Sequence, residues 1–225
     1  EMYGTMQMVF QDPVSSFDPR KTLGYGIGES LRNRGMKKTE VDERVKQALE
    51  QCGLSREFAD RYPHEVSGGQ CQRAAIARAL IVEPKILICD EATSALDVTI
   101  QKQIMELLQE LKEKRGLSFI FICHNLALVQ EFCDRVLVLY DGKNVEEGTT
   151  DKVILHPQNE YTKKLEEDLF ENSNNYVIPI QKVKDKIIEE EKENKKKYGN
   201  CLITMYEDEL VNRDIRILQE LIEER

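Results

Sequence analysis

Apolar positions along this chain fall into two kinds of segment. Three stretches carry apolar residues at helical spacing or are rich in alanine, and they predict helices at Thr39–Cys52, Gln70–Leu80 and Val98–Lys114. Short apolar runs predict strands at Met6–Phe10, Lys85–Cys89, Ser118–Cys123 and Arg135–Tyr140. Because strand-length and helix-length segments alternate from residue 84 onward, the pattern favours an α/β fold with a largely parallel sheet.

The same pattern divides the chain into three parts. Residues 1–83 hold the first strand and a helical region, residues 84–170 hold the strand–helix alternation, and residues 171–225 form a charged, mostly helical C-terminal extension. Within the extension, Lys182–Lys197 is almost entirely Lys and Glu, which favours a solvated helix or a flexible linker. The spacing of apolar residues in Val211–Ile222 fits a helix–helix contact, either with the rest of the chain or with another chain.

Composition and charge argue against several classes of protein. The net charge of −9 argues against a general nucleic-acid-binding protein, which usually carries a basic surface. No segment approaches the roughly 20 apolar residues of a membrane span, so work at a membrane would require docking by a partner. The 6 cysteines form no C-x-x-C pair, and we expect free thiols rather than disulfides or a zinc site.

A glycine-rich turn opens the alanine-rich helix. Ser67-Gly68-Gly69-Gln70 places a hydroxyl and exposed backbone N–H groups at the positive end of the helix dipole, an arrangement that suits an anion. An ordinary helix cap has the same residues, so this turn alone leaves both interpretations open.

Two adjacent carboxylates follow the second predicted strand. Asp90 and Glu91 come directly after Ile86–Cys89, at the strand end where parallel sheets place their ligands. Asp90 suits Mg²⁺, and Glu91 suits a water molecule that attacks a phosphate. A solvated strand end is the alternative.

The order of these motifs carries a specific resemblance. The turn Ser67–Gln70, the acidic pair Asp90–Glu91, the segment Ser94–Asp97 and His124 after the next strand resemble the motif series of ABC-type ATPases over about residues 5–165. The resemblance implies a P-loop NTPase-like (RecA-like) core with a helical signature subdomain. It makes Ser67–Gln70 the signature motif, Asp90–Glu91 the Walker B pair, Ser94–Asp97 the D-loop, and Gln11 the Q-loop glutamine.

The resemblance also implies roles for individual residues. Glu91 and His124 would be catalytic, and Asp90 with Gln11 would hold Mg²⁺. The residues implied to contact ATP are Ser67, Gly68, Gly69, Gln70, Gln11 and Asp97. In this family, two subunits share each ATP, so that the phosphate-binding loop of one and the signature motif of the other hold the same nucleotide.

Further motifs narrow the subfamily. Val9–Pro13, Tyr62–Glu65 and Ser94–Val98 resemble the ATPase subunits of oligopeptide, dipeptide and nickel importers. This implies an ATPase subunit that lies in the cytoplasm, on the inner face of the cell membrane, and powers the uptake of peptides. Its partners would be a second ABC ATPase subunit, as a homodimer or a heterodimer, and transmembrane permease subunits. The choice of cargo would belong to subunits other than this ATPase.

One family motif is absent from these 225 residues. The phosphate-binding pattern G-x-x-x-x-G-K-[ST] does not occur, and Gly142-Lys143 lies in a predicted strand turn. We expect the chain to begin after this loop and to bind ATP poorly alone. The alternative function is therefore a truncated, non-autonomous module that supplies its signature face to a partner's ATP site or acts through its tail. A soluble ABC protein of ribosomes or DNA is less favoured, because that class usually has two cassettes or a basic surface.

Overall fold

A computed structural model describes residues 2–94, 96–172 and 201–205. It divides into two compact units, the first from Glu1 to Ile122 and the second from Cys123 onward. This boundary differs from the three-part division expected from the sequence, because strand β1 (Met6–Val9) pairs with strand β2 (Ile86–Asp90). The two units are described separately below.

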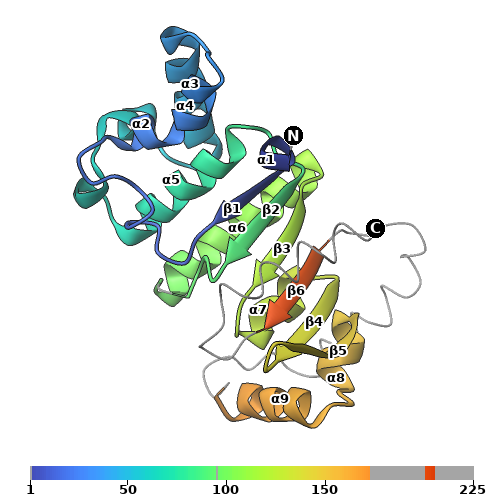
Figure 1. Cartoon of the computed structure of the whole chain (residues 1–225). Coiled ribbons are helices and arrows are strands. Elements are labelled where there is room, and N and C mark those ends of the chain that lie inside the picture. Colours follow the sequence, from blue (N-terminus) through green and yellow to red (C-terminus); the bar gives the residue numbers. More distant parts are fainter. Residues whose placement is uncertain (1, 95, 173–200, 206–225) are drawn as a thin grey trace. The chain divides into compact units, whose positions relative to one another are not determined.

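Three parallel strands form the sheet of the first unit. β1 pairs with β2, and β2 pairs with β3 (Ser118–Ile122), as Figure 1 shows in blue and green. Almost every residue of β3 is buried, which fits the continuous apolar run in its sequence. Each of these strands lies where the apolar pattern predicted it.

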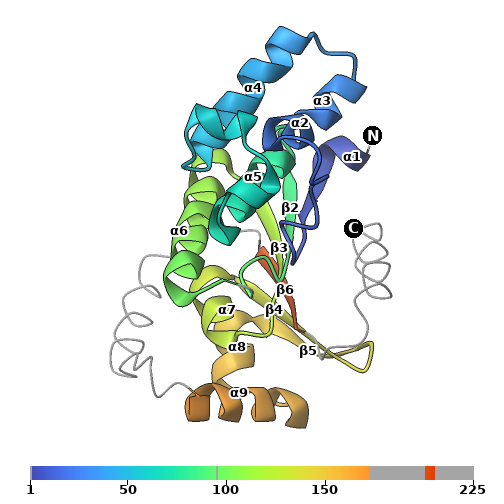
Figure 2. The same ribbon diagram turned by 90° about the vertical axis from the view of Figure 1, so that its left-hand side faces the viewer.

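Helices make up the rest of the first unit. Its α-helices are α1 (Met2–Thr5), α2 (Leu23–Ile27), α3 (Glu29–Asn33), α4 (Lys38–Gln51), α5 (Gly68–Leu80) and α6 (Val98–Arg115). Two short 3-10 helices, η1 (Arg56–Asp60) and η2 (Pro63–Glu65), connect α4 to α5. α4 packs beside α5, as Figure 2 shows, and α5 packs against β1 and α6. Alanine and other small residues on α5 allow this close packing, since nearly the whole helix is buried.

Capping residues set the starts of α5 and α6 and the end of α6. Ser67 and Gln70 form a reciprocal capping box at the start of α5. The Asp97 carboxylate accepts a hydrogen bond from the Ile100 N–H at the start of α6. Gly116 ends α6 in the left-handed conformation, with a φ of 60°, which glycine adopts without strain.

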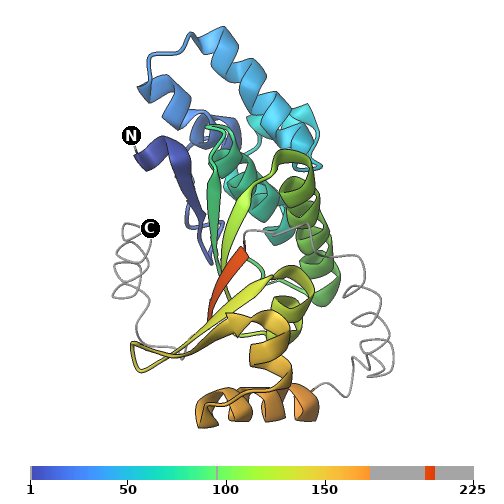
Figure 3. The ribbon, with the colours of Figure 1, turned by 90° about the vertical axis from the view of Figure 1, so that its right-hand side faces the viewer.

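The second unit combines a hairpin with helices. Strands β4 (Arg135–Tyr140) and β5 (Lys143–Thr149) are antiparallel and are joined at Asp141-Gly142, where both residues have positive φ. The unit's helices are α7 (Leu126–Phe132), α8 (Thr150–Leu155) and α9 (Glu160–Asn172). α8 packs on β5 and contacts both α7 and α9 (Figure 3).

A further strand lies in the C-terminal extension. The sequence predicts a mostly helical extension without assigning residues 201–205, and Cys201–Met205 forms β6 and pairs in parallel with β4. The backbone of β4 offers hydrogen-bonding groups on the side away from β5, and this long-range pairing leaves no trace in the local periodicity. The predicted segments Lys182–Lys197 and Val211–Ile222 lie outside the described residues.

Two expectations about the whole chain can be compared with the described residues. Cys52, Cys71, Cys89, Cys123 and Cys133 are buried, and no disulfide joins any two of them. Across residues 2–94, 96–172 and 201–205, no helix combines the length and the apolar character that crossing a lipid bilayer requires.

Candidate functional site

The acidic pair stands at the carboxyl end of β2. Asp90 is only 8% exposed, and burial, followed by the neighbouring Glu91 charge, raises the pKa of its carboxyl above the ordinary value. Glu91 has a φ of 43°, and its N–H donates to the carbonyl of Ile122, 2.9 Å away, at the end of β3. The backbone of Glu91 is thus held by the neighbouring strand in a conformation unusual for a residue with a side chain.

Gln11 reaches this pair from the adjacent strand. Val9 of β1 lies level with Cys89 of β2, so the residues after the two strands emerge at the same edge of the sheet. The Gln11 amide nitrogen donates to the Glu91 Oε2 atom at 2.6 Å. The structure therefore brings Gln11 and Glu91 into direct contact.

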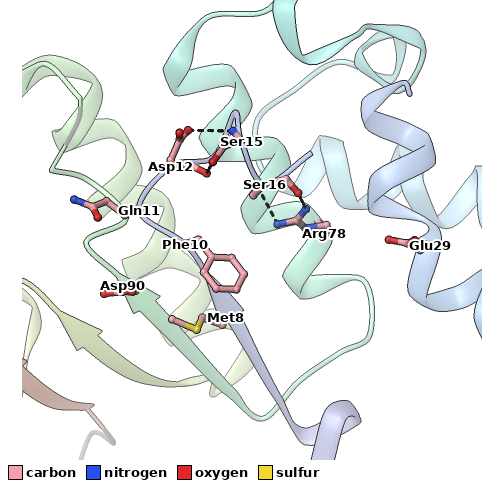
Figure 4. Close-up of a pocket in the computed structure, with 9 residues that line it drawn as sticks. All are labelled: Met8, Phe10, Gln11, Asp12, Ser15, Ser16, Glu29, Arg78 and Asp90. Atoms are coloured by element: carbon pink, nitrogen blue, oxygen red, sulfur yellow. Dashed lines mark hydrogen bonds between the residues drawn. The ribbon is translucent and has the colours of Figure 1, made fainter. Parts of the chain in front are cut away.

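An open cavity of about 550 Å³ adjoins these residues. Gln11 and Asp90 line it together with residues of the following loop and of α3 and α5, drawn in Figure 4. These further lining residues are Met8, Phe10, Asp12, Ser15, Ser16, Glu29 and Arg78. None of these seven was predicted as a site residue, because their types are common in loops and on helix surfaces.

Hydrogen bonds fix the loop after Gln11. The Asp12 carboxylate accepts from the N–H groups of Val14 and Ser15 at 3.0 and 3.1 Å. The bond from Ser15 is the main cause that lowers the pKa of the Asp12 carboxyl. The Ser16 hydroxyl donates to the Pro13 carbonyl at 2.7 Å. The loop is therefore a series of closed turns rather than a slack connection.

The signature residues lie at the start of α5, where Ser67 and Gly68 are exposed and Gly69 is buried. Ser67 Oγ accepts from the Gln70 N–H at 3.3 Å, and the Gln70 side-chain oxygen accepts from the Ser67 N–H at 2.9 Å. A Cβ atom on Gly69 would lie 2.5 Å from Ile100 of α6, so the close approach of the two helices requires glycine. A separate cavity of about 380 Å³ is lined by Ser67, Gly69 and Gln70, among others. Both interpretations of this turn thus remain open: the capping is present, and the polar atoms face an open space.

The D-loop segment connects the acidic pair to α6. The Ser94 hydroxyl donates to the Glu91 carbonyl at 3.0 Å. Leu96 approaches the signature turn, since a Cβ on Gly68 would lie 3.8 Å from its side chain. Asp97 is exposed and caps α6, while Ala95 lies outside the described residues. Asp97 therefore has a structural role that the motif comparison alone did not include.

His124 belongs to the second unit. It lies exposed in the turn that precedes α7, and the following Asn125 caps that helix by accepting from the N–H groups of Ala127 and Leu128. Its predicted cooperation with Glu91 stays a prediction from the motif order.

The parallel sheet, the carboxylate pair at its edge and the glycine-opened helix define an α/β protein of the P-loop NTPase-like class. Residues 1–94 match the family model described as ABC transporter. The chain is 54% identical over 162 residues to the oligopeptide transport ATP-binding protein OppF of Escherichia coli K12, a match that covers 71% of this chain and 48% of that protein. On these matches, residues 1–94 match the ABC transporter family, and the chain is similar to ATP-binding proteins of transporters over 71% of its length.

Other similar proteins agree with this assignment. The glutathione import ATP-binding protein GsiA of Pectobacterium atrosepticum is 48% identical over 161 residues, which cover 71% of this chain and 26% of GsiA. A dimeric, post-hydrolysis structure of the ATP-binding cassette MJ0796 bound to ADP and phosphate superimposes with a TM-score of 0.58 and 31% identity, covering 66% of this chain and 64% of that one. The chain spans about half the length of OppF, with 48% of the Escherichia coli protein matched.

Proposed function

We propose that this chain is part of an ATP-binding and ATP-hydrolysing subunit of an ABC importer for peptides. The observation that carries the proposal is the contact between Gln11 and Glu91 at 2.6 Å, beside the buried carboxyl of Asp90. A strand end with two carboxylates and a polar amide is suited to a metal ion and a water molecule. The similarity to OppF and GsiA, whose names specify oligopeptide transport and glutathione import, supports the class of cargo.

The residues at this strand end fit Mg²⁺. Burial, and after it the neighbouring Glu91 carboxylate, raises the pKa of the Asp90 carboxyl, and a cation beside the pair would offset the repulsion between the two carboxylates. Because the Gln11 amide nitrogen faces Glu91, the amide oxygen is the atom left for a metal. Within the described residues, no three His, Cys, Asp or Glu side chains cluster, so water and phosphate oxygens would complete the coordination, as is usual for Mg²⁺. Bound there, Mg²⁺ supplies positive charge to the phosphates.

We assign the proton chemistry to Glu91. Its carboxylate accepts a hydrogen bond from Gln11 and can accept one from the attacking water, which it orients and polarises. His124 is assigned to the same reaction. Ser67, Gly68, Gly69 and Gln70 are assigned to the phosphates of an ATP shared with a second ABC ATPase subunit, through the N–H groups at the start of α5. Asp97 is assigned to the same interface.

The proposal includes a place of action. Transmembrane permease subunits would dock the protein on the inner face of the cell membrane, and ATP hydrolysis would drive uptake through them. Cargo selection then belongs to the other subunits. This chain would contribute ATP hydrolysis and not the choice of peptide.

The test uses the complete encoded protein with its partner subunits. Glu91→Gln keeps the size of the side chain and its hydrogen-bonding capacity but removes the base. We expect ATP turnover to fall at least about 100-fold, the scale of general-base catalysis, while ATP binding is retained. Uptake of labelled oligopeptide into cells should be lost in parallel.

The matched control is Glu110→Gln in the same unit. Glu110 is an exposed residue of α6 whose carboxylate pairs with Lys114 at 2.9 Å, so the change should leave turnover unchanged. Undiminished hydrolysis by Glu91→Gln would remove Glu91 from the role assigned here. Full ATP turnover by the wild-type complex without uptake of oligopeptide would support the ATPase activity and reject peptides as the cargo.

A further inference from the structure

We propose that Arg78 is a positioning residue that holds the loop after Gln11 and thereby couples the signature helix α5 to the Gln11–Glu91 pair. This inference rests on the function proposed above. It concerns a residue near the far end of α5, which the motif series does not include.

Two hydrogen bonds join Arg78 to the loop. Its Nη1 atom donates to the Ser16 carbonyl at 2.5 Å, and its Nη2 atom donates to the Ser16 hydroxyl at 3.0 Å, both marked in Figure 4. The two residues are 62 positions apart in the sequence. A planar guanidinium can make both bonds at once with a fixed geometry, whereas the ammonium group of lysine cannot reproduce this fork.

The aromatic ring next to Ser16 strengthens the attachment. The guanidinium carbon of Arg78 lies 4.4 Å from the centre of the Phe17 ring. The ring is buried and also contacts α2, where a Cβ on Gly26 would lie 2.6 Å from its edge. Phe17 is thus enclosed by Arg78 and α2, and the loop has little freedom to move at this point.

The environment of Arg78 sets it apart from a surface arginine. Burial is the first cause that lowers the pKa of its guanidinium, with the negative charge of Glu29 acting in the opposite direction. No carboxylate of the described residues forms an ion pair with it within 4.0 Å, and its donors are directed at Ser16 instead. Since burying a charge is costly, this arrangement is retained only where the contacts compensate.

The loop transmits the position of Ser16 to Gln11. The Ser16 hydroxyl donates to the Pro13 carbonyl, and the Asp12 carboxylate closes the next turn through Val14 and Ser15. Gln11 precedes this turn directly. A shift of α5 at Arg78 would therefore displace the amide that contacts Glu91, so the end of the signature helix and the catalytic carboxylate are mechanically linked.

The first experiment measures the loop itself. In the complete encoded protein, hydrogen–deuterium exchange of residues 12–17 is compared between wild type, Arg78→Gln and Arg78→Lys. Both variants should exchange faster in this loop, with the β-sheet unchanged. Ser16→Ala, which removes only the hydroxyl, should have a smaller effect in the same direction and tests the contact even if the arginine variants fold poorly. Unchanged exchange in all three variants would overturn the proposal.

The second experiment measures coupling. The loss of kcat caused by Arg78→Gln is compared in the wild-type and Gln11→Ala backgrounds with the partner subunits present. We expect about a tenfold loss in the wild type, with KM for ATP little changed, and almost no further loss once Gln11 is absent. Equal losses in both backgrounds would mean that Arg78 does not act through Gln11.

Arg56→Gln provides the matched control. Arg56 also makes two polar side-chain contacts, to Glu43 and Glu50, but it is exposed and lies in η1. It should change neither loop exchange nor coupling, and the same response from this variant would refute a specific role for Arg78. If the wild-type complex hydrolyses no ATP, the proposed function fails, while loop exchange still decides the role of Arg78.

Discussion

Burial changes the chemistry of individual side chains in this protein, and two cysteines show the effect clearly. The Cys52 thiol is fully buried, and burial raises its pKa from 9.0 to about 12. Burial likewise raises the pKa of Cys71 from 9.0 to about 11. Because the thiolate is the reactive form, both side chains should be inert in the folded protein.

We therefore predict slow alkylation of Cys52 and Cys71 by iodoacetamide at pH 8. Labelling in buffer should be at least about 100-fold slower than in about 8 M urea, where the chain is unfolded and both thiols are accessible with ordinary pKa values. Site-resolved mass spectrometry measures both rates. Labelling in buffer as fast as in urea would contradict the burial of these side chains.

The same shifts have a consequence for stability. Unfolded thiols ionise near pH 9, whereas these two stay protonated in the folded chain up to about 11 and about 12. The unfolded state thus loses protons first, and the free energy of unfolding decreases as the pH rises above about 9. Below that pH, the contribution of both thiols is fully present.

At the residue scale, the candidate residues could be named from the sequence, but their contacts could not. Asp90 and Glu91 were singled out because they follow an apolar run, and Gln11 because of the family resemblance; the structure places all three where neighbouring parallel strands end. Arg78 was missed because its bonds to Ser16 join segments 62 residues apart. Contacts of this length depend on the packing of whole elements, which local patterns do not encode.

At the scale of elements, one helix start combines stability with the candidate site. Asp97 caps α6 through a 3.0 Å hydrogen bond to the Ile100 N–H, and it also belongs to the D-loop. Loss of such a cap typically costs about 1 kcal/mol.

We predict that Asp97→Ala lowers the free energy of unfolding by about 1 kcal/mol, while Asp97→Ser, which retains a capping oxygen, stays within about 0.5 kcal/mol of the wild type. Urea denaturation measures both. ATP turnover is measured on the same variants: a loss in Asp97→Ser, despite its retained cap, would assign Asp97 a role beyond the helix. Equal stability of the alanine variant and the wild type would contradict the cap.

Elements with strong periodicity were predictable, and β6 was not. The predicted strand at Arg135–Tyr140 has the bounds of β4. The predicted helix at Gln70–Leu80 ends at the same residue as α5. Their signals are local: continuous apolar runs and alanine-rich helical spacing. β6 forms by pairing with β4 from far along the chain, and its five residues resemble neither a long strand nor a helix start.

At the scale of the whole molecule, the proposed role of the signature turn requires a second ABC ATPase subunit. If Ser67–Gln70 complete the ATP site of a partner, then adding this chain to a full-length ABC ATPase subunit of the peptide-importer group should raise ATP turnover in proportion to the complex formed. Ser67→Arg should abolish the increase, because a bulky cation replaces the capping hydroxyl at the start of α5.

The readout is phosphate release during a titration with the purified chain. The control is Thr39→Arg, an exposed position near the start of α4 that lines neither cavity. No change in turnover with the wild-type chain would reject the shared site, and an increase that survives Ser67→Arg would reject the role of this turn.

The left-handed backbone at Glu91 sets a limit on how stable this protein can become. A non-glycine residue at a φ of 43° costs on the order of 1 kcal/mol relative to glycine. Selection for stability alone would favour glycine at this position, yet the chain keeps a carboxylate there. The molecule is thus held below its attainable stability at the point where the proposed chemistry needs a negative charge.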